Sequence, residues 1–496
     1  MEIYQVSRAK TGHTVNRKSL SAAVPWAAFD AVAAAALNLF TIALLSKILS
    51  PRDFGLVVLA QSVVAVVQLV GGLGLQDAIV QRKQIDQACQ DSAFTTSSVM
   101  GLVGSVVCAL IAAILARAGQ DTTLCYVILV EGLSCTLVGI ATLPTAILTR
   151  SLRTSTLAKR TLVGRLSYLL VATLLALSHW GLWSIVIANA VQNLICTAMV
   201  WLSIENKPKL RFSWAHTKGL IAFGAPVMLE GVLWSVLTRV FNVLVARYHG
   251  LDALGFLNMA MRATDALAGI VQSVCSKVAL PMLSQHQDDP GRLRLSFMRA
   301  TELLSFISFP AFLGLGVTSD LWVPLLLGQQ WSNAVPAVQL LCVYWAVMLA
   351  RMFVAYCLRA VGKTTVYLLP AGISAITTVA AVILMSGMEP IYTVYAWAGR
   401  LIITVPIGAY LLLRFTSIDY RSQFSPLVGP AFCSVLMIAA IVWLRHSYTP
   451  ANSYYLLLAE ILIGMLSYAV VAAAYYHRLT SQAARALRAR FLASAN

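Results

Sequence analysis

The chain has 496 residues, of which 59% are hydrophobic and only 11% are charged, and its formal net charge is +17. Soluble domains usually carry about 25% charged residues. The composition therefore excludes a disordered chain, a fibrous repeat, a disulfide-stapled secreted domain and an ordinary soluble enzyme, and it indicates a polytopic membrane protein.

About fourteen apolar segments follow one another along the chain, each of a length that suits a spanning helix of about 20 residues. They run near residues 21–46, 55–75, 92–116, 122–148, 161–179, 182–203, 219–245, 257–281, 302–326, 334–358, 365–387, 391–414, 426–445 and 453–476. We predict an all-α protein, because a helix satisfies its own backbone hydrogen bonds in lipid and no alternating strand pattern is visible.

The first apolar segment follows a basic N-terminus, residues 1–20, as the core of a secretory signal peptide does. The apolar run is too long for such a signal, however, and it contains Asp30. We therefore predict that this segment is retained as the first membrane span.

The distribution of Lys and Arg predicts the orientation in the membrane. If the N-terminus lies inside, the outer connections hold only Lys47, Arg52, Arg117, Arg247 and Arg445, and most other basic residues fall in the inner connections. We predict an inner-membrane protein with both termini in the cytoplasm, including a basic tail at 477–496. The positive charge then lies beside anionic lipid headgroups, so lipids rather than nucleic acid are the expected partner.

Two segments six helices apart resemble each other. Residues 50–56 (SPRDFGL) join the first and second spans, and residues 250–256 (GLDALGF) join the seventh and eighth. Six is an even number, so the two copies have parallel topology, as in transporters built from two halves. We predict two six-helix bundles, at 21–203 and 219–414, joined by a basic cytoplasmic linker at 204–218 and followed by two further helices within 415–476.

Charged side chains within the spans are the sharpest functional signal, because each costs at least about 2.5 kcal/mol in the bilayer. We predict a cationic, substrate-binding lumen from four arginines of the second bundle: Arg239, Arg262, Arg351 and Arg400. A guanidinium group donates two parallel hydrogen bonds to phosphate or carboxylate. The alternative is that each pairs with an acid, as Arg262 and Asp265 could on one helix. Arg165 lies near the inner edge, where a long side chain can reach the headgroups.

Polar and aromatic side chains within the spans are the candidates for glycan contact. They are Gln61, Gln68, Asn189, Asn193, Asn258, Trp234 and Trp397. Gln61 and Gln68 are seven residues apart and share a helix face, and Trp397 lies one turn from an arginine. Amides can bind sugar hydroxyls, but hydrogen bonds between helices are the alternative for the amides, and packing against lipid is the alternative for the tryptophans.

Three acids are candidates for coupling to a Na⁺ or H⁺ gradient: Asp30, Glu131 and Glu230. A carboxylate in apolar surroundings readily takes a proton or a cation. The nine cysteines and seven histidines are scattered, so we predict no disulfide, metal site or cofactor. No nucleophile–base set or pair of catalytic carboxylates can be assembled, which favours a transporter over an enzyme.

Three stretches carry a resemblance: residues 49–56 (LSPRDFGL), 68–75 (QLVGGLGL) and 78–82 (AIVQR). They resemble the N-terminal pattern of bacterial polysaccharide flippases. These are O-antigen and exopolysaccharide exporters, including the succinoglycan type, within the multidrug/oligosaccharidyl-lipid/polysaccharide superfamily. The resemblance implies a V-shaped pair of bundles that moves undecaprenyl-pyrophosphate-linked oligosaccharide repeat units across the inner membrane of a Gram-negative cell. It also implies a polysaccharide polymerase or export machinery as partner.

Two alternatives remain at this point. A drug/cation antiporter of the same superfamily would share the layout, but it should have a lumen dominated by carboxylates. A membrane glycosyl polymerase should have a sizeable outer loop for its active site, and no connection here looks longer than about twenty residues.

Overall fold

The computed structural model describes residues 37, 40–41, 43–72, 75–76, 79, 86–151, 153–204, 207–284, 289–363, 366, 368–416, 418–448 and 452–493. Over these residues the chain is built from helices. They are α2 (Pro51–Gly72), α4 (Gln87–Arg117), α5 (Thr122–Arg150), α6 (Thr154–Leu177), α7 (Trp183–Ser203), α8 (Trp214–Ser284), α9 (Pro290–Val317), α10 (Ser319–Trp322), η2 (Val323–Leu327), η3 (Gln329–Ala334), α11 (Val335–Ala350), α12 (Met352–Ala360), α13 (Leu368–Leu384), α14 (Ile391–Thr416), α15 (Tyr420–Ser447) and α16 (Ser453–Ala493).

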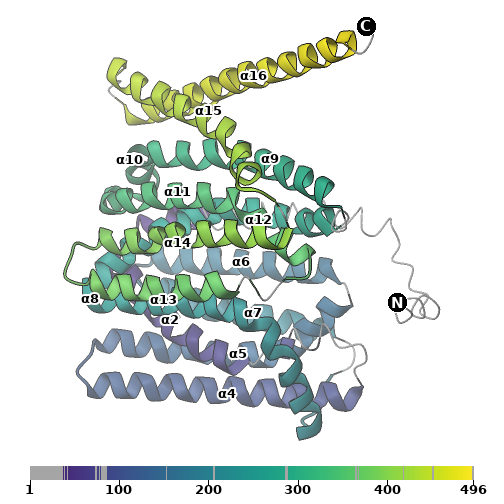
Figure 1. Ribbon diagram of the computed structural model, residues 1–496. Helices are drawn as coiled ribbons and strands as arrows, with labels where there is room; N and C mark the ends of the chain where they lie inside the picture. The colour runs from purple at the N-terminus through teal and green to yellow at the C-terminus, as the bar shows by residue number, and fades with distance from the viewer. Residues whose placement is uncertain are drawn as a thin grey trace, which may run out of the picture.

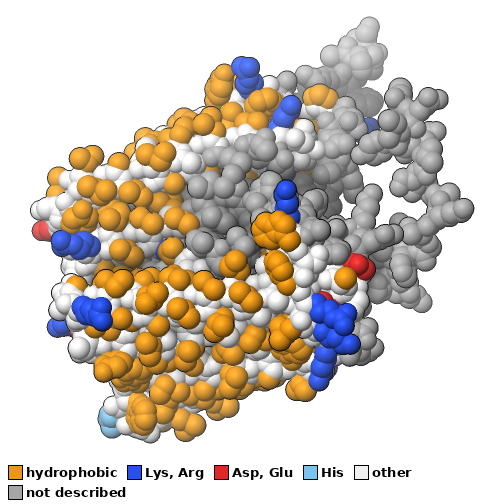
Figure 2. Space-filling model, turned by 90° about the horizontal axis from the view of Figure 1, so that it is seen from below, with side chains coloured by type: hydrophobic (Ala, Val, Ile, Leu, Met, Phe, Trp, Pro, Cys, Tyr) orange, Lys and Arg blue, Asp and Glu red, His pale blue; other side chains and the backbone are white. Residues whose placement is uncertain are grey.

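Most of the long helices lie side by side, with α4 and α5 at one edge and α15 and α16 at the other (Figure 1). In the described ranges, nine helices are long and apolar enough to cross a membrane. Hydrophobic side chains cover the outer face of the bundle along the helices (Figure 2), and Leu102, Leu174 and Ile402 are among those exposed. Such a surface is stable in lipid. The predicted all-α membrane protein is confirmed, whereas the count of fourteen spans and the proposed domain boundaries stay predictions.

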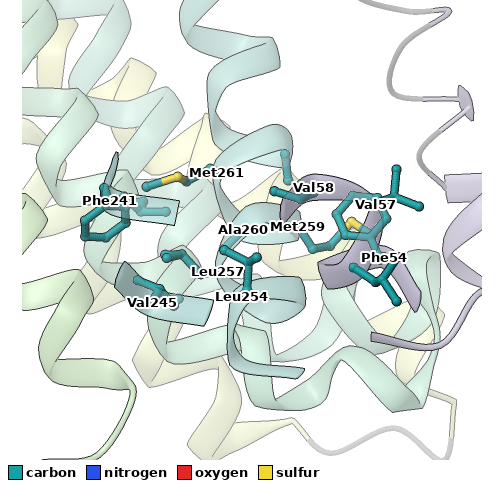
Figure 3. Close-up of a cluster of buried hydrophobic side chains, with 14 of the residues drawn as sticks. Phe54, Val57, Val58, Phe241, Val245, Leu254, Leu257, Met259, Ala260 and Met261 are labelled. Atoms are coloured by element: carbon teal, nitrogen blue, oxygen red, sulfur yellow. The ribbon is translucent and has the colours of Figure 1, made fainter. Parts of the chain in front are cut away.

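Helix α8 consists of two arms that meet at Gly250. This glycine has φ 84° and ψ 177°, so the chain reverses there without leaving the helical hydrogen-bonding pattern on either side. The conformation favours glycine because it has no side chain. The turn falls between the seventh and eighth predicted spans. Helix α2 packs against both arms, and Figure 3 shows the apolar side chains that fill this contact.

A cluster of charges joins helices α15 and α16 to α9 and α10. The Arg445 guanidinium donates to both carboxylate oxygens of Glu460, at 2.6 and 2.9 Å, and to Asp320 Oδ1 at 2.8 Å. It also donates to the Val317 carbonyl at 2.9 Å. Glu460 is fully buried. Because Val317 ends α9 and Asp320 lies in α10, the cluster fixes both C-terminal helices to the second half of the chain.

The described part of the basic linker lies against one end of α4. The Lys209 amide donates to Asp91 Oδ1 at 2.9 Å, and the Ser92 hydroxyl donates to the Ser213 carbonyl at 3.0 Å. Thr217, in the first turn of α8, is within 3.0 Å of the same Ser92 hydroxyl. The linker therefore continues directly into α8 along the surface of the first half of the chain.

Candidate functional site

A polar cavity of about 290 Å³ lies between helices of the two halves of the chain. Its walls come from Leu37, Thr41 and Leu45 and from α2, α6 and α7 on one side, and from the second arm of α8 on the other. Seven polar side chains line it: Thr41, Gln61, Arg165, Tyr168, Asn189, Gln192 and Arg262. Phe54, Leu45 and Met259 form an apolar part of the wall. Most ligand sites are lined mainly by apolar side chains, so the polar lining of this cavity favours a charged or hydroxylated ligand.

Arg262 reaches the cavity from α8. Its Nη2 donates a long hydrogen bond, 3.4 Å, to Gln61 Oε1, and its guanidinium lies 4.8 Å from the centre of the Phe54 ring. The ion pair with Asp265 that the sequence allowed is not the contact that forms, because Asp265 accepts a hydrogen bond from Trp345 Nε1 at 2.9 Å. Arg262 and Asp265 thus form hydrogen bonds with different partners, Gln61 and Trp345, although they are one helical turn apart.

A carboxylate stands behind the Gln61 amide. Glu131 of α5 is 8% exposed, and its Oε1 accepts from Gln61 Nε2 at 3.3 Å and from Asn189 Nδ2 at 3.0 Å. Gln61 therefore bridges an acid and a cation: its nitrogen donates to Glu131 and its oxygen accepts from Arg262. The same amide group thus contacts both charged side chains.

Arg165 and Tyr168 line the cavity, although the sequence placed Arg165 among residues that reach for the membrane surface. The two are one helical turn apart on α6 and share a face. The presence of a cation and an amphipathic ring on one face of an apolar helix was the sequence signal that could have indicated a cavity-lining role for both. The membrane-surface assignment used depth alone, and depth does not say whether a side chain points to lipid or inward.

The remaining three predicted arginines do not line this cavity. Arg400, in α14, is buried; its Nη2 donates to the Tyr344 hydroxyl, and its guanidinium lies 3.8 Å from the Trp397 ring centre. Arg351, between α11 and α12, donates to Gln423 Oε1 at 3.0 Å. Arg239, in the first arm of α8, makes no hydrogen bond or ion pair with the described residues, and it lies close enough to Arg262 for their charges to repel.

The predicted glycan contacts separate into two groups. Gln61 and Asn189 face the cavity, as does Gln192, the neighbour of the predicted Asn193. Gln68 instead donates to the Ser134 hydroxyl at 2.7 Å, between α2 and α5.

Asn258 and Trp397 also have partners within the bundle. Asn258 donates to Asn242 Oδ1 at 3.2 Å, and Asn242 donates to the Ser62 hydroxyl at 3.0 Å. Trp397 packs against Phe241, with ring centres 4.7 Å apart, as well as against Arg400. Asn258 thus makes the contact between helices that was the alternative for the amides, whereas Trp397 is buried within the bundle and packs against neither lipid nor the described cavity.

Three predicted residues lie outside the described part of the molecule. Asp30 precedes the first described residue, and the side chains of Glu230 and Trp234, in the first arm of α8, are likewise outside it. Among the three ion-coupling candidates, Glu131 is thus the one whose side chain is described.

Comparison with known proteins places this geometry in a family. The chain is 25% identical to the succinoglycan biosynthesis transport protein ExoT of Rhizobium meliloti, over 92% of this chain and 93% of that protein. It is 24% identical to the lipopolysaccharide biosynthesis protein WzxC of Escherichia coli, over 66% and 67% of the two chains. These relatives agree with the prediction of a transport protein rather than an enzyme.

The fold agrees with solved transporters. The lipid II flippase MurJ, in an inward closed conformation, superimposes with a TM-score of 0.77 at 15% identity, covering 91% of this chain and 99% of that one. An inward-facing multidrug resistance transporter of the MATE family gives 0.61 at 14% identity, covering 77% and 95%. The model of the family described as "Polysaccharide biosynthesis protein" matches residues 44–336. Because that match covers more than half of the sequence, the chain belongs to the polysaccharide biosynthesis protein family.

Proposed function

We propose that the protein is a flippase that moves lipid-linked oligosaccharide repeat units across the inner membrane for exopolysaccharide synthesis, with undecaprenyl pyrophosphate as the lipid carrier. The observation that carries the proposal is the cavity between the two halves, which presents Arg165 and Arg262 to its interior. The transport relatives support the substrate class. The predicted orientation, with both termini cytoplasmic, identifies the inner and outer faces of the protein, and the proposed transport runs from the inner face to the outer.

The physical task is to shield the charged headgroup from hydrocarbon. An unpaired charge in an apolar medium is prohibitively costly, so the phosphates need a polar passage with fixed donors. The guanidinium forks of Arg165 and Arg262 can each bind phosphate oxygens through paired hydrogen bonds. A bound phosphate would compete with Gln61 Oε1 for Arg262, whose contact with that oxygen is long at 3.4 Å.

Other lining groups suit the sugar. The amides of Asn189 and Gln192 can exchange hydrogen bonds with hydroxyls, and the aromatic side chain of Tyr168 can pack against a pyranose. The cavity, at about 290 Å³, is at the lower end of the usual range of ligand sites, about 300–1,000 Å³. It therefore holds the headgroup and its first sugar, with the lipid tail left in the bilayer and the two halves rocking to expose the glycan outside.

Glu131 is the described candidate for coupling to a Na⁺ or H⁺ gradient. A proton or cation on Glu131 weakens its pull on the Gln61 amide, and Gln61 in turn contacts Arg262. The released repeat unit would pass to a polymerase or export complex. The rival function is drug/cation antiport, because the chain has a fold similar to that of the MATE transporter. A cavity with two arginines, however, favours an anionic substrate.

The test compares two arginines of the same helix in a strain that lacks the chromosomal copy. Arg262→Gln removes one of the two cavity cations, and Arg247→Gln, at an exposed position of α8, is the matched control. We expect Arg262→Gln to reduce polymer export at least about tenfold, the value of one charge-assisted hydrogen bond, and to accumulate lipid-linked repeat units facing inward. Full export from Arg262→Gln at normal protein level would refute the proposed site, and loss of drug resistance instead would favour the antiporter.

A further inference from the structure

The two repeat segments found in the sequence meet face to face in the structure. A Cβ atom built on Gly55 of α2 would lie 1.9 Å from the Leu251 carbonyl oxygen, and one built on Gly255 of α8 would lie 2.0 Å from the Pro51 carbonyl oxygen. The contact is reciprocal, with each glycine against the start of the other repeat. No side chain fits at either position, so the two helices touch through their backbones.

Apolar side chains extend this contact on both sides of the glycines. Figure 3 shows Phe54, Val57 and Val58 of α2 beside Leu254 and Leu257 of α8, all of them buried. The interface is thus closely packed, and it joins the first half of the chain to the second.

A tryptophan from the second half closes the same end. Trp331, in η3, is fully buried and packs edge-on against Phe54 and Phe256, with ring centres 5.7 and 6.0 Å away. Its Nε1 donates to the Ser46 carbonyl at 2.7 Å. Because Phe54 and Phe256 flank the two crossing glycines, Trp331 covers the crossing and ties it to the end of the segment that precedes α2.

The neighbouring residue reinforces this attachment. Gln330 Nε2 donates to the Leu49 carbonyl at 3.0 Å and to the Ser46 carbonyl at 2.5 Å. All of these bonds join neutral groups, which makes them weaker than charge-assisted bonds. Breaking these bonds therefore costs less free energy than breaking charge-assisted bonds, which suits a contact that opens and closes.

This closed end borders the cavity. Phe54 contacts Trp331 on one side and lines the cavity on the other, where Arg262 lies over its ring. Leu45, one residue before Ser46, also lines the cavity. The wall at this end is thus made of the same residues that hold the two halves together.

We propose that the Gly55–Gly255 crossing, with Gln330 and Trp331, is a reversible seal that closes the cavity toward the outer face of the membrane. The positive-inside distribution assigns this end to the outside. Both halves contribute to the seal, so rocking of the halves separates it and opens the cavity for release. The inference rests on the proposed transport function, but its test does not require substrate.

The test asks whether a side chain at the crossing opens the cavity. A carbon–oxygen contact needs about 3.3 Å, so the Cβ of Gly255→Ala would push α2 and α8 apart by about 1.3 Å and shift the population toward the open state. The control is Gly269→Ala, in the same helix with no atom within 4 Å of the new Cβ. The reporter is Thr41→Cys, which lines the cavity and is 7% exposed.

Spheroplasts are treated with a membrane-impermeant maleimide, and labelling is corrected with the same variants lacking the reporter cysteine. We expect labelling of Thr41→Cys from outside to rise at least about fivefold with Gly255→Ala and to stay at the parent level with Gly269→Ala. Unchanged labelling in Gly255→Ala protein that is present in the membrane overturns the seal.

A milder variant guards against misfolding. Gln330 is exposed, so Gln330→Ala should fold; it removes two hydrogen bonds and should raise labelling about threefold. No increase with this variant also counts against the seal. If Gly255→Ala opens the cavity while Arg262→Gln leaves export intact, the seal stands and the proposed substrate site is wrong.

Discussion

The charge cluster at Arg445 allows a quantitative prediction about stability. Arg445→Met removes the guanidinium and leaves Glu460, which is 0% exposed, with an unpaired buried carboxylate. Breaking such a pair typically costs about 3–5 kcal/mol. The side chain of Asp320 is 42% exposed, so solvent screens its contact with Arg445, and Asp320→Asn should cost less than about 1 kcal/mol.

The decisive variant removes both charges of the buried pair. In Arg445→Met/Glu460→Leu no charge is left without a partner, so most of the lost stability should return. The measurement is the free energy of unfolding in mixed detergent micelles, titrated with dodecyl sulfate and followed by tryptophan fluorescence. A double variant as unstable as Arg445→Met, or an Asp320→Asn variant that costs as much, would refute the reasoning from burial.

Three further predictions concern the cavity and the contact between the halves. Arg165→Gln should lower export about tenfold, through loss of a charge-assisted hydrogen bond, whereas Lys159→Gln, exposed on the same helix, should export normally. In Glu131→Gln, export should not change when a reagent collapses the Na⁺ or H⁺ gradient. If export by this variant still depends on the gradient, a residue other than Glu131 couples transport to it. Asn242→Leu removes the centre of a buried amide chain and should lower the free energy of unfolding by about 1–3 kcal/mol in the same micelle titration.

The general architecture could be predicted from the sequence because lipid imposes strict rules. Long apolar runs must be helical, and the turn at Gly250 lies between two such runs. The repeat at 50–56 and 250–256 predicted two parallel halves, but it did not predict that its two copies touch. The contact of Gly55 and Gly255 with one another's helices depends on the folded arrangement of the halves.

The site was predictable in part, and the reason is geometrical. Position along a span gives the depth of a side chain, which is why Arg262 and Gln61 were found. Direction around the helix depends on neighbours from distant segments. Arg400 turns toward Tyr344 of α11, and Arg351 toward Gln423 of α15. Those partners lie 56 and 72 residues away in the chain, beyond the reach of any local pattern.

Arg445 also has a consequence for the way the molecule moves. Helices α15 and α16 pack on one another and on α9, α10 and α14, and the charge cluster fastens them there. In the proposed rocking motion, α15 and α16 therefore move with the second half as one rigid unit. A fluorophore attached to α16 would move with that half, and its distance from a second dye on α4 would report the proposed change of conformation.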